Sequence, residues 1–154
     1  MKQTFDRRSV LGIAIGGAAG AVMLASAQPS YAAVMNFKAD LKGSSEVPPN
    51  QTTGTGSVTA SYDPATKMLT WSGSFAGLTG PATAAHFHGP AEAGKNAGVA
   101  IWLSEKGTPL ASPFKGMATL TDAQASDLQA GLWYANIHTA ANPGGELRGQ
   151  VVKA

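Results

Sequence analysis

The three histidines of the chain lie in the two segments that are richest in side chains able to do chemistry. His86 and His88 belong to AAHFHGP at residues 84–90, and His138 belongs to NIHTAANPGGELRGQ at residues 136–150. Alternate residues of a strand share a face, so His86 and His88 point to the same side. Neutral imidazoles suit copper, zinc or nickel, and a third one from a neighbouring strand leaves one position open. The spacing therefore predicts a metal site at His86, His88 and His138, with copper as the expected ion and zinc as the alternative.

The second segment holds further polar residues that we expect to support this site. Glu146 and Arg148 point the same way along one strand, so they are predicted to pair with each other or across the sheet. Either Glu146 or Asp122 would add an oxygen ligand to the ion, or water would fill that position. Asn136 and Asn142 are predicted to hydrogen-bond turn backbone, with lining of the site as the alternative.

A structural role is the alternative interpretation of the histidines. They would then hydrogen-bond loop backbone at the mouth of a β fold and hold no ion. The three tryptophans, Trp71, Trp102 and Trp133, are expected in the core, with an exposed Trp102 as the exception. No spacing in the sequence indicates a Ser-His-Asp triad, so we assign no catalytic residue.

Short strands separated by turns must position these side chains. Residues 56–62 and 68–75 alternate apolar and polar side chains on either side of an Asp63-Pro64 turn, which predicts a hairpin. Seven or eight such strands predict an all-β fold, an antiparallel Greek-key sandwich or barrel. The other strands are predicted at residues 36–41, 82–88, 99–103, 114–120, 132–138 and 146–152.

One short helix is predicted at residues 121–130. Thr121 and Gln124 have the spacing of a capping box, and Gly131 follows where a helix commonly ends. A helix this short depends on tertiary packing, for which Leu120 and Leu128 are the expected anchors.

The beginning of the chain is predicted to be an export signal. Arg7 and Arg8 precede a glycine-rich apolar run, and a small-residue cleavage site ends at Ala32. Paired arginines followed by apolar residues are typical of a twin-arginine signal. An uncleaved membrane anchor is the alternative, because the run is close to the minimum spanning length of ~17 residues. We therefore predict a signal peptide at residues 1–32 and a domain at residues 33–154, located in the periplasm or outside the cell.

The predicted domain is electrically neutral and lacks cysteine. Of the 11 basic and 9 acidic residues of the chain, Lys2, Arg7, Arg8 and Asp6 lie in the signal, which leaves eight of each. A neutral body without a basic stripe argues against nucleic acid as a partner. With 0 cysteines, disulfides, thiolate metal sites and cysteine nucleophiles are excluded.

An ordered set of motifs runs through the predicted domain. In chain order the motifs are FKADL at residues 37–41, EVPP at 46–49, the stretch 54–62, AHFHGPA at 85–91, residues 128–131, YANIHT at 134–139 and NPGGELRGQ at 142–150. This set resembles the CHRD domain, the module named after chordin. The resemblance implies an exported or extracellular protein with an immunoglobulin-like β fold and no established biochemical activity.

A more distant similarity is to Cu/Zn superoxide dismutase. It rests on a His-x-His strand, a later strand histidine, and an arginine after a glycine-rich loop. It implies that His86, His88 and His138 bind copper and that Arg148 guides the anion. The bridging histidine, the separate zinc ligands and the cysteine pair have no counterpart here, so the similarity supports a mononuclear copper site at most.

Three hypotheses about function follow. The first is an exported, non-enzymatic CHRD module that binds copper or zinc through His86, His88 and His138. The second is a superoxide dismutase-like copper enzyme in which Arg148 steers the anion. The third is a structural or adhesive surface domain that holds no ion. The sequence identifies no protein partner and no oligomeric state.

Overall fold

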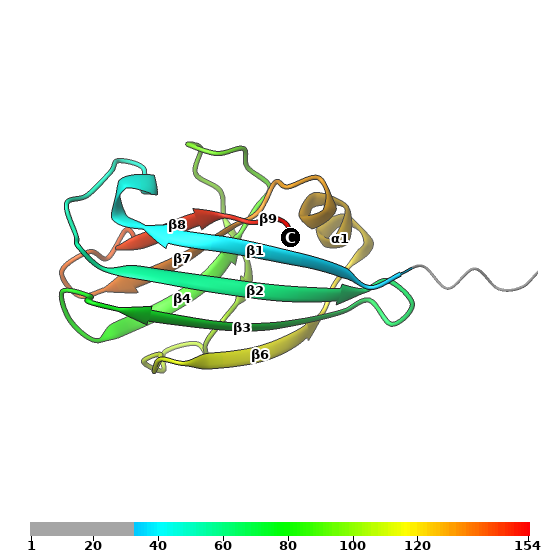
Figure 1. Ribbon diagram of the computed structural model, residues 1–154, viewed down its shortest axis with the longest axis horizontal. Coiled ribbons are helices and arrows are strands. Elements are labelled where there is room, and N and C mark those ends of the chain that lie inside the picture. Colours follow the sequence, from blue (N-terminus) through cyan, green and yellow to red (C-terminus); the bar gives the residue numbers. More distant parts are fainter. Residues whose placement is uncertain (1–32) are drawn as a thin grey trace, which may run out of the picture. The chain divides into compact units, whose positions relative to one another are not determined.

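The computed structural model describes residues 33–154, which contain nine strands, one α-helix and one short 3-10 helix (Figure 1). The predicted export signal, residues 1–32, lies outside the described residues. All eight predicted strands are present, and the last one is divided in two at Val151. The elements are β1 (Met35–Lys42), η1 (Gly43–Ser45), β2 (Thr55–Asp63), β3 (Met68–Ala76), β4 (Ala82–His88), β5 (Val99–Trp102), β6 (Phe114–Thr119), α1 (Asp122–Gln129), β7 (Tyr134–Thr139), β8 (Leu147–Gln150) and β9 (Val152–Lys153).

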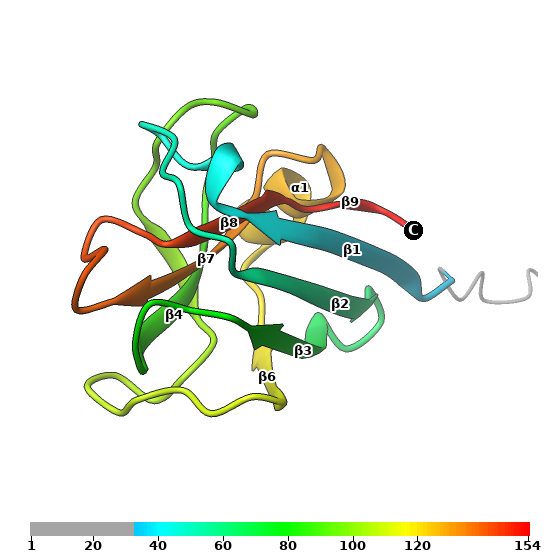
Figure 2. The ribbon, with the colours of Figure 1, turned by 60° about the vertical axis from the view of Figure 1, so that its left-hand side comes forward.

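The strands form one antiparallel sheet that curls into an almost closed barrel (Figure 2). The order of neighbours is β5-β4-β7-β8-β1-β2-β3-β6, and β9 pairs with β1 beside β8. The β2–β3 hairpin is regular from Thr55↔Ala76 to Asp63↔Met68. Neighbours that are not consecutive in the chain, such as β4 with β7 and β8 with β1, require crossover connections. The predicted all-β antiparallel class with a single short helix is confirmed.

Apolar residues on the inner face of the curled sheet form the core. Alternation along β1 buries Phe37, Ala39 and Leu41, and the polar residues between them face outward. Two of the three tryptophans follow the prediction, since Trp71 and Trp133 are buried in this core. Trp102 is 37% exposed, which makes it the expected exception.

The helix forms where its capping signals predict it. The Thr121 side chain accepts from the Gln124 backbone N–H, while the Gln124 side chain accepts from the Thr121 N–H. Gly131 has φ +74°, in the left-handed region that glycine tolerates. Leu128 is buried and anchors the helix. Among the described residues, no helix is long and apolar enough to cross a membrane.

The outer face of β4, β7 and β8 is polar and yet buried, because loops cover it. Asn96, in the loop between β4 and β5, contacts the side chain of Arg148 on β8. Asn50, in the segment after β1, donates to the carbonyls of Gly145 and Glu146. A second, polar layer therefore lies outside the sheet. Its buried members are Glu46, His86, Asn136 and Arg148, and two further buried polar residues, Thr139 and Glu146, bond each other at the end of β7.

Candidate metal centre

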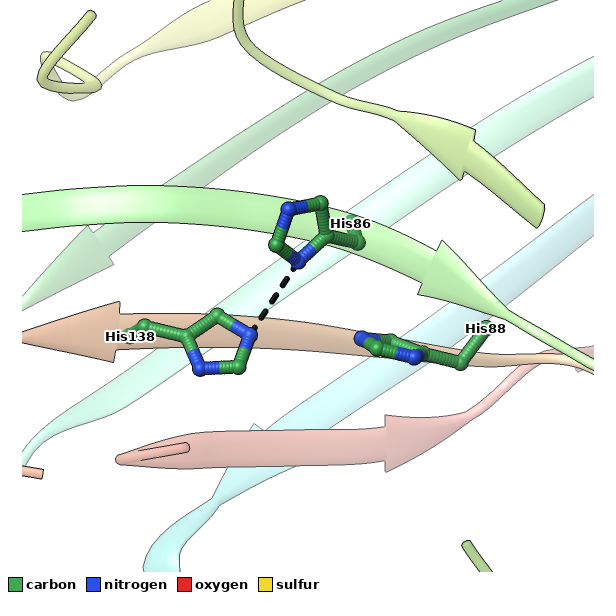
Figure 3. A group of neighbouring side chains, drawn as sticks. All are labelled: His86, His88 and His138. Atoms are coloured by element: carbon green, nitrogen blue, oxygen red, sulfur yellow. Dashed lines mark hydrogen bonds between the residues drawn. The ribbon is translucent and has the colours of Figure 1, made fainter. Parts of the chain in front are cut away.

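The sheet brings the three histidines together in this polar layer. β4 and β7 are antiparallel neighbours, with His86 opposite Asn136 and His138 opposite Ala84. One ring nitrogen of each histidine lies within 4.8 Å of one ring nitrogen of the other two. Figure 3 shows His86 and His138 joined by a hydrogen bond, with His88 beside them. The two segments that hold the histidines, far apart in the sequence, therefore place the three imidazoles side by side.

Backbone carbonyls fix two of the three rings. His88 Nδ1 lies 3.0 Å from the carbonyl oxygen of Ala97, and His138 Nδ1 lies 3.0 Å from that of Pro143. A carbonyl oxygen only accepts, so each Nδ1 carries the proton and donates it. The Nε2 atoms of His88 and His138 then keep their lone pairs. Histidines that bind metals are oriented by the same kind of contact at the other ring nitrogen.

His86 completes the group with a different arrangement. Its Nδ1 lies 3.1 Å from His138 Nε2 and donates to it, because that atom has no proton. His86 Nε2 and His88 Nε2 are buried without a hydrogen-bond partner in the described structure. Buried polar atoms are normally paired. The cluster thus holds unpaired nitrogen lone pairs of the kind that a metal ion satisfies.

The surroundings keep all three rings neutral. Burial, assisted by the neighbouring His138 and His88, lowers the pKa of His86 to about 4. Burial also lowers the pKa of His88 and of His138, although their hydrogen bonds to carbonyls act in the opposite direction. Neutral imidazole is the form that binds a metal ion. No proton has to leave the cluster as a whole before an ion enters at neutral pH.

Two aromatic side chains flank the cluster. Trp102 on β5 lies opposite His86 and meets its ring edge to face, with centroids 4.1 Å apart. Tyr134 on β7 lies opposite His88, and the two rings stack at 4.8 Å with an interplanar angle of 4°. The sequence analysis did not assign Tyr134 to the site. Its position in the YANIHT motif, four residues before His138 on the same face, was the available signal.

Glu146 is not positioned as a metal ligand. It is completely buried, and its carboxylate accepts from Thr52, Thr79, Thr139 and Asn142 over 2.6–3.1 Å. Burial alone would raise its pKa, but these hydrogen bonds together lower it to about 2. The predicted ion pair with Arg148 is absent from the described part of the chain.

Arg148 and Asp122 also depart from their predicted roles. Asp122 pairs with Lys67 on the surface, 2.6 Å from its Nζ, and supplies no oxygen to the histidines. Arg148 is only 2% exposed, and its guanidinium donates to the Asn96 side chain and to the Lys95 carbonyl. A guanidinium held in this way does not reach solvent to guide an anion.

Asn136 links the strands to a buried acid, Glu46, that the sequence analysis did not assign to the site. Its side-chain NH2 donates to the Leu147 carbonyl, which belongs to strand β8 and not to the predicted turn, and to Glu46 Oε1. Burial raises the pKa of Glu46 to about 7, against the lowering effects of Asn136 and Arg148. The periodicity of the sequence does not predict the contact between Asn136 and Glu46, because Glu46 lies outside the strands. Asn142 departs from its prediction, because its side chain donates to Glu146 and Thr79 and to no turn backbone.

Fold and side chains together define a curled antiparallel β domain with a loop-covered polar face that presents three neutral histidines. The chain belongs to the CHRD domain family, because the family model described as the CHRD domain matches residues 37–151. This span covers nearly the whole described domain and confirms the resemblance seen in the motifs. No curated protein and no solved structure matches the chain.

Proposed function

We propose that this protein is an exported CHRD-domain module that binds one copper or zinc ion through His86, His88 and His138. The observation that carries the proposal is the clustering of three ring nitrogens within 4.8 Å of one another. The export component rests on the twin-arginine pattern of residues 1–32 and places the protein in the periplasm or outside the cell.

The distances in the cluster suit such an ion after a small adjustment. Zinc or copper bound to imidazoles at about 2.0–2.1 Å holds its ligand nitrogens about 3.3–3.6 Å apart. His86 Nδ1 and His138 Nε2 are already 3.1 Å apart. Binding at His86 Nδ1 transfers the proton of that ring to Nε2. A rotation of the His88 ring that moves its ligand nitrogen by roughly 1 Å then brings all three nitrogens within bonding distance of one ion.

Calorimetric titration of the purified domain with Cu(I), Cu(II) and Zn(II) tests the proposal. We expect one ion per chain for at least one of the three metals. Quenching of Trp102 fluorescence by Cu(II) should follow the same isotherm, because the indole contacts His86. His138→Ala should lower the affinity by at least ~100-fold, since losing a ligand exceeds the ~10–100-fold effect of losing an outer contact. The proposal would be contradicted if the binding heat and the fluorescence quenching matched those of the variant that lacks all three histidines.

The hydrogen bonds from His88 to Ala97 and from His138 to Pro143 favour a second candidate, a purely structural role. In that case alanine at all three histidines lowers the free energy of unfolding and changes no metal response. Thermal unfolding of the wild type with and without metal separates the two candidates, because only a bound ion stabilises the folded chain.

A further inference from the structure

Three side chains from three neighbouring strands form a stack beside the histidine cluster. The strands are adjacent in the order β4-β7-β8, and they contribute His88, Tyr134 and Arg148. Tyr134 lies between the other two. Its ring is parallel to that of His88, with the centroids 4.8 Å apart, and Arg148 Cζ lies 3.5 Å from the centroid of the Tyr134 ring. A planar guanidinium over an aromatic face is both a cation–π and a stacking contact.

Together, the three members of the stack hold three consecutive residues of the covering loop, Lys95, Asn96 and Ala97. Arg148 donates to the Lys95 carbonyl and to the Asn96 side chain. The Tyr134 hydroxyl accepts from the Ala97 N–H and donates to the Ala97 carbonyl. That carbonyl is also the acceptor for His88 Nδ1. The oxygen that orients the ring of His88 is therefore itself held directly by Tyr134, while Arg148 holds the two residues that precede it.

The type of residue at position 148 is informative. A buried cation normally has an anionic partner, and burial without one costs free energy. Arg148 is 2% exposed and forms no close ion pair in the part of the chain that the structure describes, although its charge lowers the pKa of Glu46. Its planar fork reaches two acceptors while its flat face lies on a ring, and lysine has neither property.

We propose that Arg148, acting through Tyr134 and residues 95–97, is a positioning residue that sets the orientation of the metal ligand His88. The proposal rests on the metal-binding function above. With the stack intact, His88 Nε2 is directed towards His86 and His138. Without it, the ring of His88 and the loop over it lose their fixed position, and the site retains two oriented ligands.

Four variants of the full domain test this assignment. Arg148→Lys keeps the charge and loses the fork and the stack, whereas Arg148→Met loses the charge as well. Tyr134→Phe keeps the ring and removes the hydroxyl that binds Ala97. Lys115→Met is the matched control, because it removes an exposed cation on β6, at the other end of the sheet order. Each variant is titrated with the metal that the wild type binds best, and its His88 ring nitrogens are followed by NMR without metal.

We expect Arg148→Lys and Arg148→Met to lower metal affinity about 10–100-fold, the range for contacts that orient a ligand. Tyr134→Phe should fall at the lower end of that range, and Lys115→Met should match the wild type. In the metal-free protein, the His88 Nδ1–H signal should exchange faster with water in both Arg148 variants. If Arg148→Lys does not fold, Tyr134→Phe carries the same comparison.

The outcomes separate this assignment from the function on which it rests. A wild type that binds no metal overturns the proposed function and, with it, the positioning role. A wild type that binds metal while folded Arg148→Lys and Tyr134→Phe bind within twofold of it overturns the positioning role alone. An unchanged His88 Nδ1–H exchange rate in these variants also contradicts it.

Discussion

Glu146 shows how one buried carboxylate holds several loops together. Its acceptor positions are filled by groups from three segments, represented by Thr52, Thr79 and Thr139. Because every hydrogen-bond partner is a donor, the charged form suits the site, which explains a pKa lowered to about 2. Glu146 therefore contributes to the geometry of the loops around the histidines without binding an ion.

Replacing this carboxylate by an amide tests its structural role. Glu146→Gln places an NH2 group among donors that need an acceptor, so we expect the free energy of unfolding to fall by about 3 kcal/mol. Urea denaturation at pH 7 measures the change. Glu92→Gln is the matched control, because Glu92 is exposed, and it should change stability by no more than about 0.5 kcal/mol. A loss below about 1 kcal/mol in Glu146→Gln would contradict the description.

Glu46 makes stability depend on pH in the opposite direction from most carboxylates. Its pKa rises from an ordinary 4.5 to about 7 in the folded domain because it is buried. Folding therefore favours the protonated form, whose contribution is complete below pH 4.5 and is lost as pH rises through about 7. The contribution is about 3 kcal/mol at most.

Urea denaturation at intervals from pH 4.5 to 8 measures this effect. The difference in stability between the wild type and Glu46→Gln should change progressively with pH, to the disadvantage of the wild type at the alkaline end. Glutamine does not ionise and keeps an oxygen for the Asn136 NH2. A constant difference across this range would show that Glu46 has an ordinary pKa.

At the scale of elements, the sequence predicts the strands better than the contacts of the loops that cover them. Alternation placed His86 and His88 on one face, and the order of the strands then brought His138 to them. The contacts of Glu46 and Asn96 with the polar face were not predictable. They join loops to strands 90 and 52 residues away along the chain, and no local period records them.

The loop between β7 and β8 illustrates such a hidden constraint. Gly145 has φ +135°, and a Cβ there would lie 2.6 Å from Asn136 Nδ2 and from Glu46 Oε1. Both the backbone conformation and the space exclude a side chain. Gly144, the preceding residue, has no atom within 4 Å of such a position.

This pair of glycines provides a matched test of the loop. Gly145→Ala should lower the free energy of unfolding by about 2–4 kcal/mol, because it combines strain with a steric clash. Gly144→Ala should stay within about 0.5 kcal/mol of the wild type. Equilibrium denaturation of the two variants under identical conditions makes the comparison. Equal effects would mean that the loop does not pack as described.

At the scale of the whole domain, the polar layer is where loops and sheet meet. His88 holds the loop of residues 89–98 through Ala97, and His138 holds the loop of residues 140–146 through Pro143. An ion shared by the histidines would tie both loops to β4 and β7 at one point. Binding should therefore stabilise the domain globally and protect both loops.

Thermal unfolding and amide hydrogen exchange follow this coupling. At a free metal concentration 100 times the dissociation constant, the folded state gains about 2.7 kcal/mol, which for a domain of this size raises the melting temperature by about 10 °C. Exchange should slow at the amides of residues 95–97, 142, 144 and 145, while those of residues 65–67, in the β2–β3 turn, should exchange as before. The variant with alanine at His86, His88 and His138 should show neither response. Protection confined to one of the two loops would contradict this coupling. It would mean that the ion is held either by His138 on β7 or by the histidines of β4, and not by both strands.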